Sequence, residues 1–211
     1  PLAMKEAAME WLQMCIDNGF YNIVLSLKAS NTYVMVEAYR LLYREMVKMN
    51  KIFPLHLGVT EAGNSDAGRI KSAVGISALL SEGIGDTLRV SLTENPEKEL
   101  PVAKLIADRY NHTRRSSLAN ISIENRKAVA VYASPSRESL LVDFACDFGK
   151  RLLDKDLDEV TLCGYYRNED GSEVILDGSE EAAYLSDELL QAARRKFYRP
   201  EYIACPGCGR T

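Results

Sequence analysis

Residues 82–92 of the chain, EGIGDTLRVSL, place the end of a helix, a glycine-rich turn and an apolar strand in direct succession. Two other stretches have the same order: NGFYNIVLSL at residues 18–27 and DKDLDEVTLCG at residues 154–164. In the first half of the chain the predicted strands start near residues 22, 54 and 86, a constant spacing of 32 residues. Such a regular alternation of helix and strand predicts parallel β/α units. We therefore expect an α/β fold with units of the TIM-barrel type, and a doubly wound parallel sheet is the alternative with the same local pattern.

The spacing of apolar residues predicts the other helices and strands. Residues 111–126 are polar and are interpreted as a linker or domain boundary. A hairpin turn is expected at NEDG, residues 168–171, and Ser179 is expected to cap the helix that follows. The predicted helices are 5–18, 32–49, 68–81, 97–110, 137–153 and 179–198, and the predicted strands are 22–27, 55–59, 87–92, 127–132 and 159–165.

The composition excludes several classes of protein. The 211 residues are 46% hydrophobic and 27% charged, with a net charge of −4, which disfavours a disordered chain and a general nucleic-acid-binding or membrane-surface protein. No apolar run approaches the roughly 18 residues that a membrane helix needs. The five cysteines are not spaced like a secreted disulfide framework, so they indicate a reducing compartment. Three of them, Cys15, Cys146 and Cys163, are expected to be small core residues.

Each strand in the first half has one polar face, which becomes more polar toward the carboxyl end of the strand. In a TIM barrel this end carries the active site. Basic side chains there suit an anionic ligand such as a diphosphate, and a carboxylate among them suits proton transfer or the binding of a cation. Taken singly, each is more simply a solvated or paired structural group, but three consecutive strands with the same pattern favour a site. The candidate residues are Lys28, His56, Glu61, Arg89 and Ser91.

Two further features carry weaker signals of ligand binding. Arg69 and Lys71 follow a glycine-containing turn at the start of a predicted helix, where they could hold a phosphate, although such residues are more often a solvated face. Cys205 and Cys208 form a CPGC knuckle that presents two thiols to one metal centre. A zinc ribbon needs a second CxxC, a thioredoxin-type site needs the CxxC at a helix start, and iron–sulfur ligation needs further ligands elsewhere.

Long, ordered motifs occur at three places: FPLHLGVTEAG at residues 53–63, GRIKSAVGISALLSEGIGDTLRVSLT at residues 68–93 and EYIACPGCGRT at residues 201–211. They closely resemble the 4-hydroxy-3-methylbut-2-enyl diphosphate synthases, the iron–sulfur enzymes of the methylerythritol phosphate route to isoprenoids. The resemblance implies an N-terminal TIM barrel and a C-terminal domain with a [4Fe–4S] cluster held by three cysteines and a glutamate. It also implies an oxidoreductase that opens and reductively dehydroxylates 2-C-methyl-D-erythritol 2,4-cyclodiphosphate, with two electrons from reduced ferredoxin or flavodoxin. The implied compartment is the bacterial cytoplasm, or the plastid stroma in a plant.

The same resemblance implies a role for each candidate residue. Glu61 falls on a catalytic position that handles a proton near the departing oxygen. Cys205 and Cys208 fall on the first two metal ligands of the cluster. The lysine and the arginine of the strand face would bind the diphosphate. The substrate-binding positions fall on Lys28, His56, Arg89 and Ser91.

The distance between the motifs predicts a domain organisation. About 100 residues separate the TLRVSL strand from the CPGC motif, which resembles the large three-domain form of the family in plants and some bacteria. We expect the C-terminal part of a TIM-type barrel in residues 1–110, an inserted α/β domain in 111–200 and the start of the cluster domain in 201–211. The family's early barrel strands, its third cysteine and its glutamate ligand have no counterpart in these residues. The chain is therefore expected to be a fragment with an incomplete set of cluster ligands and no activity alone.

Two other classes of function remain open. The chain could be a non-catalytic binding or scaffold module, or a small zinc-binding α/β protein. Metal analysis separates zinc from iron–sulfur ligation, and titration with the cyclodiphosphate separates substrate binding from a scaffold role. The expected partners are this substrate and the electron donor, without nucleic acid or membrane, and the unpaired edges of a partial barrel favour a homodimer.

Overall fold

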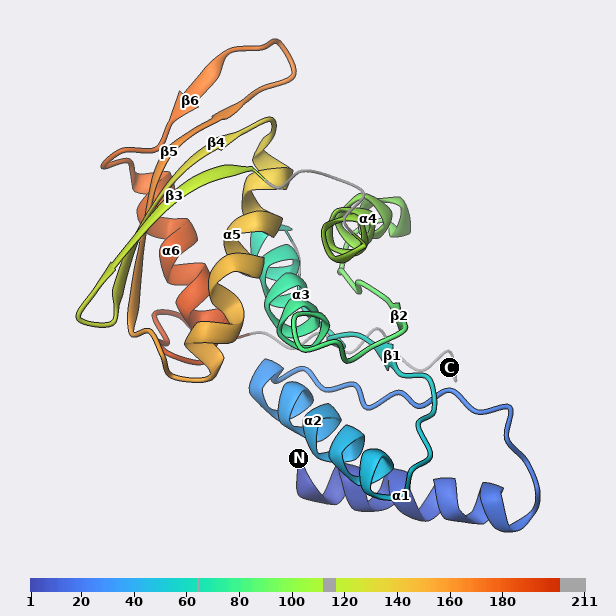
Figure 1. Cartoon of the computed structure of the whole chain (residues 1–211). Coiled ribbons are helices and arrows are strands. Elements are labelled where there is room, and N and C mark those ends of the chain that lie inside the picture. Colours follow the sequence, from blue (N-terminus) through green and yellow to red (C-terminus); the bar gives the residue numbers. More distant parts are fainter. Residues whose placement is uncertain (64, 112–116, 202–211) are drawn as a thin grey trace.

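The computed structural model describes residues 1–63, 65–111 and 117–201 (Figure 1). The helices are α1 (Leu2–Asp17), α2 (Thr32–Lys48), α3 (Ser65–Leu80), α4 (Glu99–Tyr110), α5 (Arg137–Leu153) and α6 (Glu180–Ala192), with a 3₁₀ turn η1 (Pro96–Lys98) before α4. The strands are β1 (His56–Leu57), β2 (Thr87–Leu88), β3 (Leu118–Glu124), β4 (Lys127–Ser134), β5 (Glu159–Arg167) and β6 (Glu173–Ile175). Within these residues, every helix is too short or too polar to traverse a lipid bilayer.

The first half of the chain contains parallel β/α units, as predicted, but its strands are short. β1 and β2 pair in parallel, and bridges from Leu25 to Leu55 and from Ala29 to Val59 add a third parallel segment. Residues 22–27, predicted as a strand, are extended and carry a bridge without forming a regular strand. Among the described residues the three segments do not close into a barrel, and each outer segment is bonded on one side only. A strand with one neighbour has fewer ladder hydrogen bonds to keep it regular.

The second half contains a separate mixed sheet with strand order β3-β4-β5-β6. β4 and β5 are parallel and are connected through α5, whereas β3 and β6 pair antiparallel at the two edges. The predicted hairpin at residues 168–171 is confirmed, since Asn168 N donates to Ser172 O at 2.9 Å. The predicted cap is also confirmed, because Ser179 Oγ accepts from Ala182 N at 3.1 Å.

The prediction of a linker over residues 111–126 is wrong for its second part. Residues 118–124, LANISIE, form the edge strand β3 and pair with β4 along its length. Their alternation of apolar and polar side chains is typical of a strand, but Ile121 and Ile123 stay 44% and 42% exposed. An edge strand that is solvated on both faces has the composition of a loop, and this similarity misled the prediction.

Helix α3 is the centre of the molecule, between the parallel segments and the second sheet's helices (Figure 1). Every residue from Ile70 to Leu79 is buried. On the inner side, a Cβ added to Gly75 would lie 2.6 Å from Val59 Cγ2, and on the outer side a Cβ on Gly149 of α5 would lie 3.0 Å from Val74 Cα. In a TIM barrel the outer surface of such a helix normally faces solvent. Here α5 and α6 cover it, so the two halves share one core.

Ion pairs and hydrogen bonds join the two halves at several points around α3. Arg137 at the start of α5 binds both carboxylate oxygens of Asp66 at 2.7 Å. Arg40 of α2 binds Asp154, just after α5, at 2.7 Å. Charge-assisted contacts of this kind are directional, so they fix the orientation of the second sheet as well as its attachment.

Candidate functional site

The parallel register of the first half brings two of the predicted basic residues together. The bridges from Leu25 to Leu55 and from Ala29 to Val59 put Lys28 beside Gly58, and the β1–β2 register puts Gly58 beside Arg89. A Cβ added to Gly58 would lie 3.2 Å from Lys28 Cε and 2.9 Å from Arg89 O. The lysine stem therefore crosses the space that a side chain at position 58 would fill.

His56 lies two residues before Gly58, on the same polar face of the parallel segments. Its Nδ1 is 2.8 Å from the hydroxyl of Thr87, its partner in the parallel register. Its carbonyl oxygen accepts hydrogen bonds from the Tyr39 hydroxyl at 2.5 Å and from the Ser26 hydroxyl at 3.0 Å. These two bonds hold the backbone of His56 in place. With Nδ1 engaged by threonine, Nε2 is the ring nitrogen left for a ligand.

Two of these basic groups, Lys28 and His56, have lowered pKa values. Burial, and then the charge of Arg89, hold the pKa of Lys28 below its ordinary value. Burial, followed by the charges of Lys28 and Arg89, likewise lowers the pKa of His56. The closest carboxylate in the described ion pairs is Glu99, 4.0 Å from Arg89 Nε, and Arg89 stays 59% exposed. The face therefore has an excess of positive charge that suits an anion.

The predicted residues Glu61 and Ser91 lie at the carboxyl ends of the same segments. Glu61 follows the β1 segment and is half-buried with a φ of 51°, a left-handed conformation that costs a non-glycine residue about 1 kcal/mol. Ser91 is half-buried and lies two residues after Arg89, so strand alternation gives it the same face. The structure thus brings Lys28, His56 and Arg89 together and places the other two at the edge of that group.

Arg69 and Lys71, considered above as a phosphate cradle, are occupied by acids. Arg69 binds Glu94 at 2.5 Å and Glu138 at 3.3 Å. Lys71 is 5% exposed and pairs with Glu201, which also binds Arg194. Neither cation is left unpaired, so the structure gives no support to a phosphate site on this helix turn.

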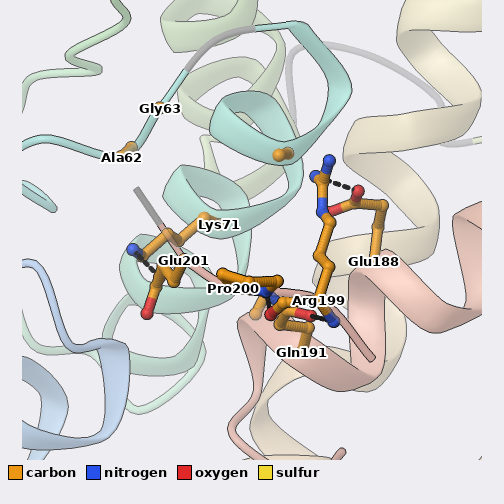
Figure 2. Close-up of a pocket in the computed structure, with 10 residues that line it drawn as sticks. Ala62, Gly63, Lys71, Glu188, Gln191, Arg199, Pro200 and Glu201 are labelled. Carbon is orange, nitrogen blue, oxygen red and sulfur yellow. Dashed lines mark hydrogen bonds and ion pairs between the residues drawn. The ribbon is translucent and has the colours of Figure 1, made fainter. Parts of the chain in front are cut away.

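The Lys71–Glu201 pair borders a cavity of about 160 Å³ between α3, α6 and the segment before Glu201 (Figure 2). Figure 2 shows a second pair there, in which Arg199 binds Glu188 of α6, itself 3% exposed. Ala62 and Gly63, directly after Glu61, line the same cavity. The chain that leads toward the CPGC motif is therefore anchored next to the turn that carries Glu61.

Cys205 and Cys208 lie outside the described residues, so their arrangement stays a prediction. Among the residues that are described, no three histidine, cysteine or acidic side chains lie close enough together to hold a metal ion. Cys146 is buried as expected, and burial raises the pKa of its thiol to about 12, whereas Cys15 and Cys163 are only half-buried.

Sequence reasoning missed several polar residues that organise the site. Thr87 was detectable, because the register that puts Arg89 beside Gly58 also puts Thr87 beside His56. Tyr39 was not, because its hydroxyl reaches the His56 carbonyl from α2, and helical spacing shows only that its ring is in the core. Glu94 carries no motif signal and binds Ser65 N at 2.6 Å across 29 residues of chain.

Comparison with known proteins identifies the first half of the chain. Residues 1–104 match the family model described as the GcpE TIM-barrel domain. The 4-hydroxy-3-methylbut-2-en-1-yl diphosphate synthase (ferredoxin) of Prochlorococcus marinus is 61% identical over 103 residues, which are 49% of this chain and 25% of the relative. The synthases (flavodoxin) of Phocaeicola vulgatus and Leptospira interrogans are 57% identical over 108 residues and 54% identical over 111 residues.

These two matches cover 51% and 53% of this chain and 18% and 17% of the relatives. The matched part of the chain thus spans a quarter or less of the length of these three proteins. It contains both the basic face and the turn with Glu61. Residues 1–104, just under half of the chain, are therefore similar to the GcpE TIM-barrel domain family.

Proposed function

We propose that this chain supplies the diphosphate-binding part of a 4-hydroxy-3-methylbut-2-en-1-yl diphosphate synthase. The substrate would be 2-C-methyl-D-erythritol 2,4-cyclodiphosphate. The observation that carries the proposal is the row formed by Lys28, Gly58 and Arg89. Its two cations lie side by side, and the one ion pair that they form among the described residues is the 4.0 Å contact from Arg89 to Glu99. The family match and the names of the relatives support the same activity.

Each residue of the site has a separate task in this proposal. Lys28 and Arg89 bind diphosphate oxygens, because two adjacent cations are stabilised by an anion that bridges them. His56 presents Nε2 to the ligand, because its Nδ1 is engaged by the Thr87 hydroxyl. Ser91 adds a hydroxyl donor at the rim. The bound anion also offsets the repulsion that, in addition to burial, lowers the pKa values of Lys28 and His56.

Glu61 is proposed to manage the proton at the carbon end of the substrate. The overall reaction opens the cyclic diphosphate, adds two electrons and two protons, and releases the departing hydroxyl oxygen as water. A carboxylic acid next to that oxygen would protonate it as the C–O bond breaks. Glu61 is suitable because it lies past the end of the β1 segment, beyond the cations that hold the phosphates.

Cys205 and Cys208 are proposed as two ligands of a [4Fe–4S] cluster. Thiolates are the donors that such clusters prefer, but two are half of a usual set, so the remaining ligands would come from elsewhere. When bound, the cluster would pass electrons to the substrate from ferredoxin or flavodoxin, the donors in the names of the relatives. We further propose that residues 111–200 are an inserted domain between the barrel segment and these cysteines.

Calorimetric titration of the 211-residue chain with the cyclodiphosphate tests the proposal. We expect binding that weakens with added salt, and at least about a tenfold loss of affinity for Lys28→Ala or Arg89→Ala, since each removes a charge-assisted contact. Lys104→Ala is the matched control, because Lys104 is an exposed lysine on α4. Equal affinities for all four proteins would show that the basic face is not the binding site. Failure of the wild-type chain to bind would reject the diphosphate-binding role.

A further inference from the structure

The turn that carries Glu61 has an unusual backbone. Glu61 and Ser65 have φ values of 51° and 50°, and Gly63 between them has a φ of 110°. Non-glycine residues avoid this region, so two of them within five positions persist only where the surroundings hold them. The tightness of the turn is visible at Gly68, where an added Cβ would lie 2.5 Å from Gly63 O.

The segment after β2 holds this turn at two points. Thr93 N donates to Gly63 O at 3.0 Å, and Glu94 Oε1 accepts from Ser65 N at 2.6 Å. The two bonds lie two and four residues after Glu61. They connect the loop after β1, which carries Glu61, to the segment that follows β2 and Arg89.

A single arginine completes this tie. Arg69 binds both oxygens of Glu94, at 2.5 and 3.2 Å, and also donates to Ser65 O at 3.0 Å. Its side chain is only 12% exposed, and its hydrogen bonds to Glu94 lower the pKa of that carboxyl group, so the carboxylate stays ionised. Its Nε reaches Glu138 of α5 at 3.3 Å, which extends the contact to the second half of the molecule.

We propose that Glu94 and Arg69 are positioning residues that hold the Glu61 carboxyl group at the site. The inference rests on the proposed function for the role of Glu61 itself. Neither residue needs to touch the substrate, because both act through the backbone of the turn. The packing of α5 against α3 also supports the turn, because Glu138 of α5 forms an ion pair with Arg69 Nε.

A purely structural role would give a different pattern. Ser65 is the first residue of α3, so Glu94 also satisfies an amide at the helix start, and its loss would weaken the helix whatever Glu61 does. A structural role therefore predicts an effect on binding that is independent of Glu61. A positioning role predicts that the effect disappears once Glu61 cannot act, which a double-mutant cycle can measure.

The test is a cycle of Glu94→Gln and Glu61→Gln in the 211-residue chain, with cyclodiphosphate and inorganic pyrophosphate as ligands. We expect Glu94→Gln to weaken cyclodiphosphate binding about fivefold in the wild-type background and less than about 1.5-fold beside Glu61→Gln. Pyrophosphate affinity should not change, because this ligand contacts only the basic face. Arg69→Met should match Glu94→Gln, and Arg69→Lys should restore most of the loss. Glu97→Gln, which changes an exposed acid in the following 3₁₀ turn η1, is the control.

Additive effects of Glu94→Gln and Glu61→Gln, or equal losses for both ligands, would overturn the inference. Amide hydrogen exchange gives a readout without any ligand: the Thr93 amide, which donates to Gly63 O, should exchange at least about tenfold faster in Glu94→Gln, while Ile76 in the middle of α3 keeps its wild-type rate. If the wild-type chain binds no cyclodiphosphate, the proposed function fails. The amide exchange then tests by itself whether Glu94 holds the turn. An unchanged exchange rate at the Thr93 amide would show that Glu94 does not hold the turn.

Discussion

The two sheets of the molecule are both covered by helices on one face, but their free faces differ in charge. In the first half, the free face carries Lys28, His56 and Arg89 in adjacent rows. In the second sheet, Val129 and Val131 of β4 lie 41% and 43% exposed on the face opposite α5 and α6. Adjacent cations repel one another unless an anion compensates their charge, whereas exposed valines are common. The comparison favours the first sheet over the second for the proposed anion binding.

The largest effect is expected from filling the gap between the two cations. In Gly58→Val the new side chain would occupy the path of Lys28 and approach the Arg89 carbonyl, where an added Cβ already lies at 2.9 Å. We expect a loss of cyclodiphosphate affinity of about 100-fold, or about 3 kcal/mol. Adding Lys28→Ala to this variant should cost little more, since the lysine is already displaced. Calorimetry measures the affinity, and circular dichroism at the same temperature checks that the variant is folded.

The second prediction concerns the attachment of the two halves. Arg137→Met leaves the Asp66 carboxylate, 8% exposed, without its bidentate partner. Because Arg137 itself is 37% exposed, the expected loss of unfolding free energy is about 2 kcal/mol, below the usual value for a fully buried pair. Arg167→Met breaks an exposed pair with Glu173 and should cost less than about 1 kcal/mol. Urea unfolding compares the two, and equal losses would mean that the contact to Asp66 does not join the halves.

Much of the basic face was predictable because it depends on local regularities. Strand alternation assigns Lys28 and Arg89 to polar faces, and the constant spacing of the β/α units predicts parallel neighbours. The contact between Lys28 and Arg89 depends on the register of the parallel segments. The 32-residue spacing alone defines that register only to within one or two residues. Strand lengths were overestimated, because the hydrophobic pattern reports burial and does not report how many ladder hydrogen bonds a segment makes.

The contacts around α3 could not be predicted in the same way. Asp66 and Arg137 are 71 residues apart and meet only because α5 packs on the outer side of α3. Helical periodicity does not reveal this packing, because a helix buried on all sides has no polar face to orient it. The same holds for Arg69, whose partners Glu94 and Glu138 come from two different halves of the chain.

Proton linkage gives a third prediction, of moderate size. The pKa of His56 is lowered by burial and by Lys28 and Arg89, so the free protein holds fewer protons than an isolated imidazole would near neutral pH. A bound diphosphate raises that pKa, so binding takes up protons and affinity must rise as pH falls. We expect a gain of about twofold to threefold from pH 7.5 to 6, measured by calorimetry in buffers of different ionisation enthalpy. His56→Gln should flatten the profile, and an affinity that rises with pH would contradict the assignment.

The same shift has a consequence for the stability of the unliganded protein. With the folded pKa of His56 below its unfolded value, the unfolded chain binds more protons, so the contribution of this residue is favourable above the unfolded pKa and declines as pH falls through it. Ligand binding and folding therefore respond to acid in opposite directions at this one side chain.

The smallest effect is expected on the free face of the second sheet. Val131→Glu adds a charge to a residue that is 43% exposed, so unfolding free energy should change by less than about 0.5 kcal/mol and cyclodiphosphate affinity should stay the same. Ala130→Glu, one residue earlier and fully buried against the helices, is the contrasting variant and should destabilise by several-fold more. If Val131→Glu lowered ligand affinity as much as Lys28→Ala, the two free faces would not be functionally distinct. An unchanged affinity for Val131→Glu, together with a large loss for Lys28→Ala, would instead restrict ligand binding to the parallel segments, where the register brings the basic residues together.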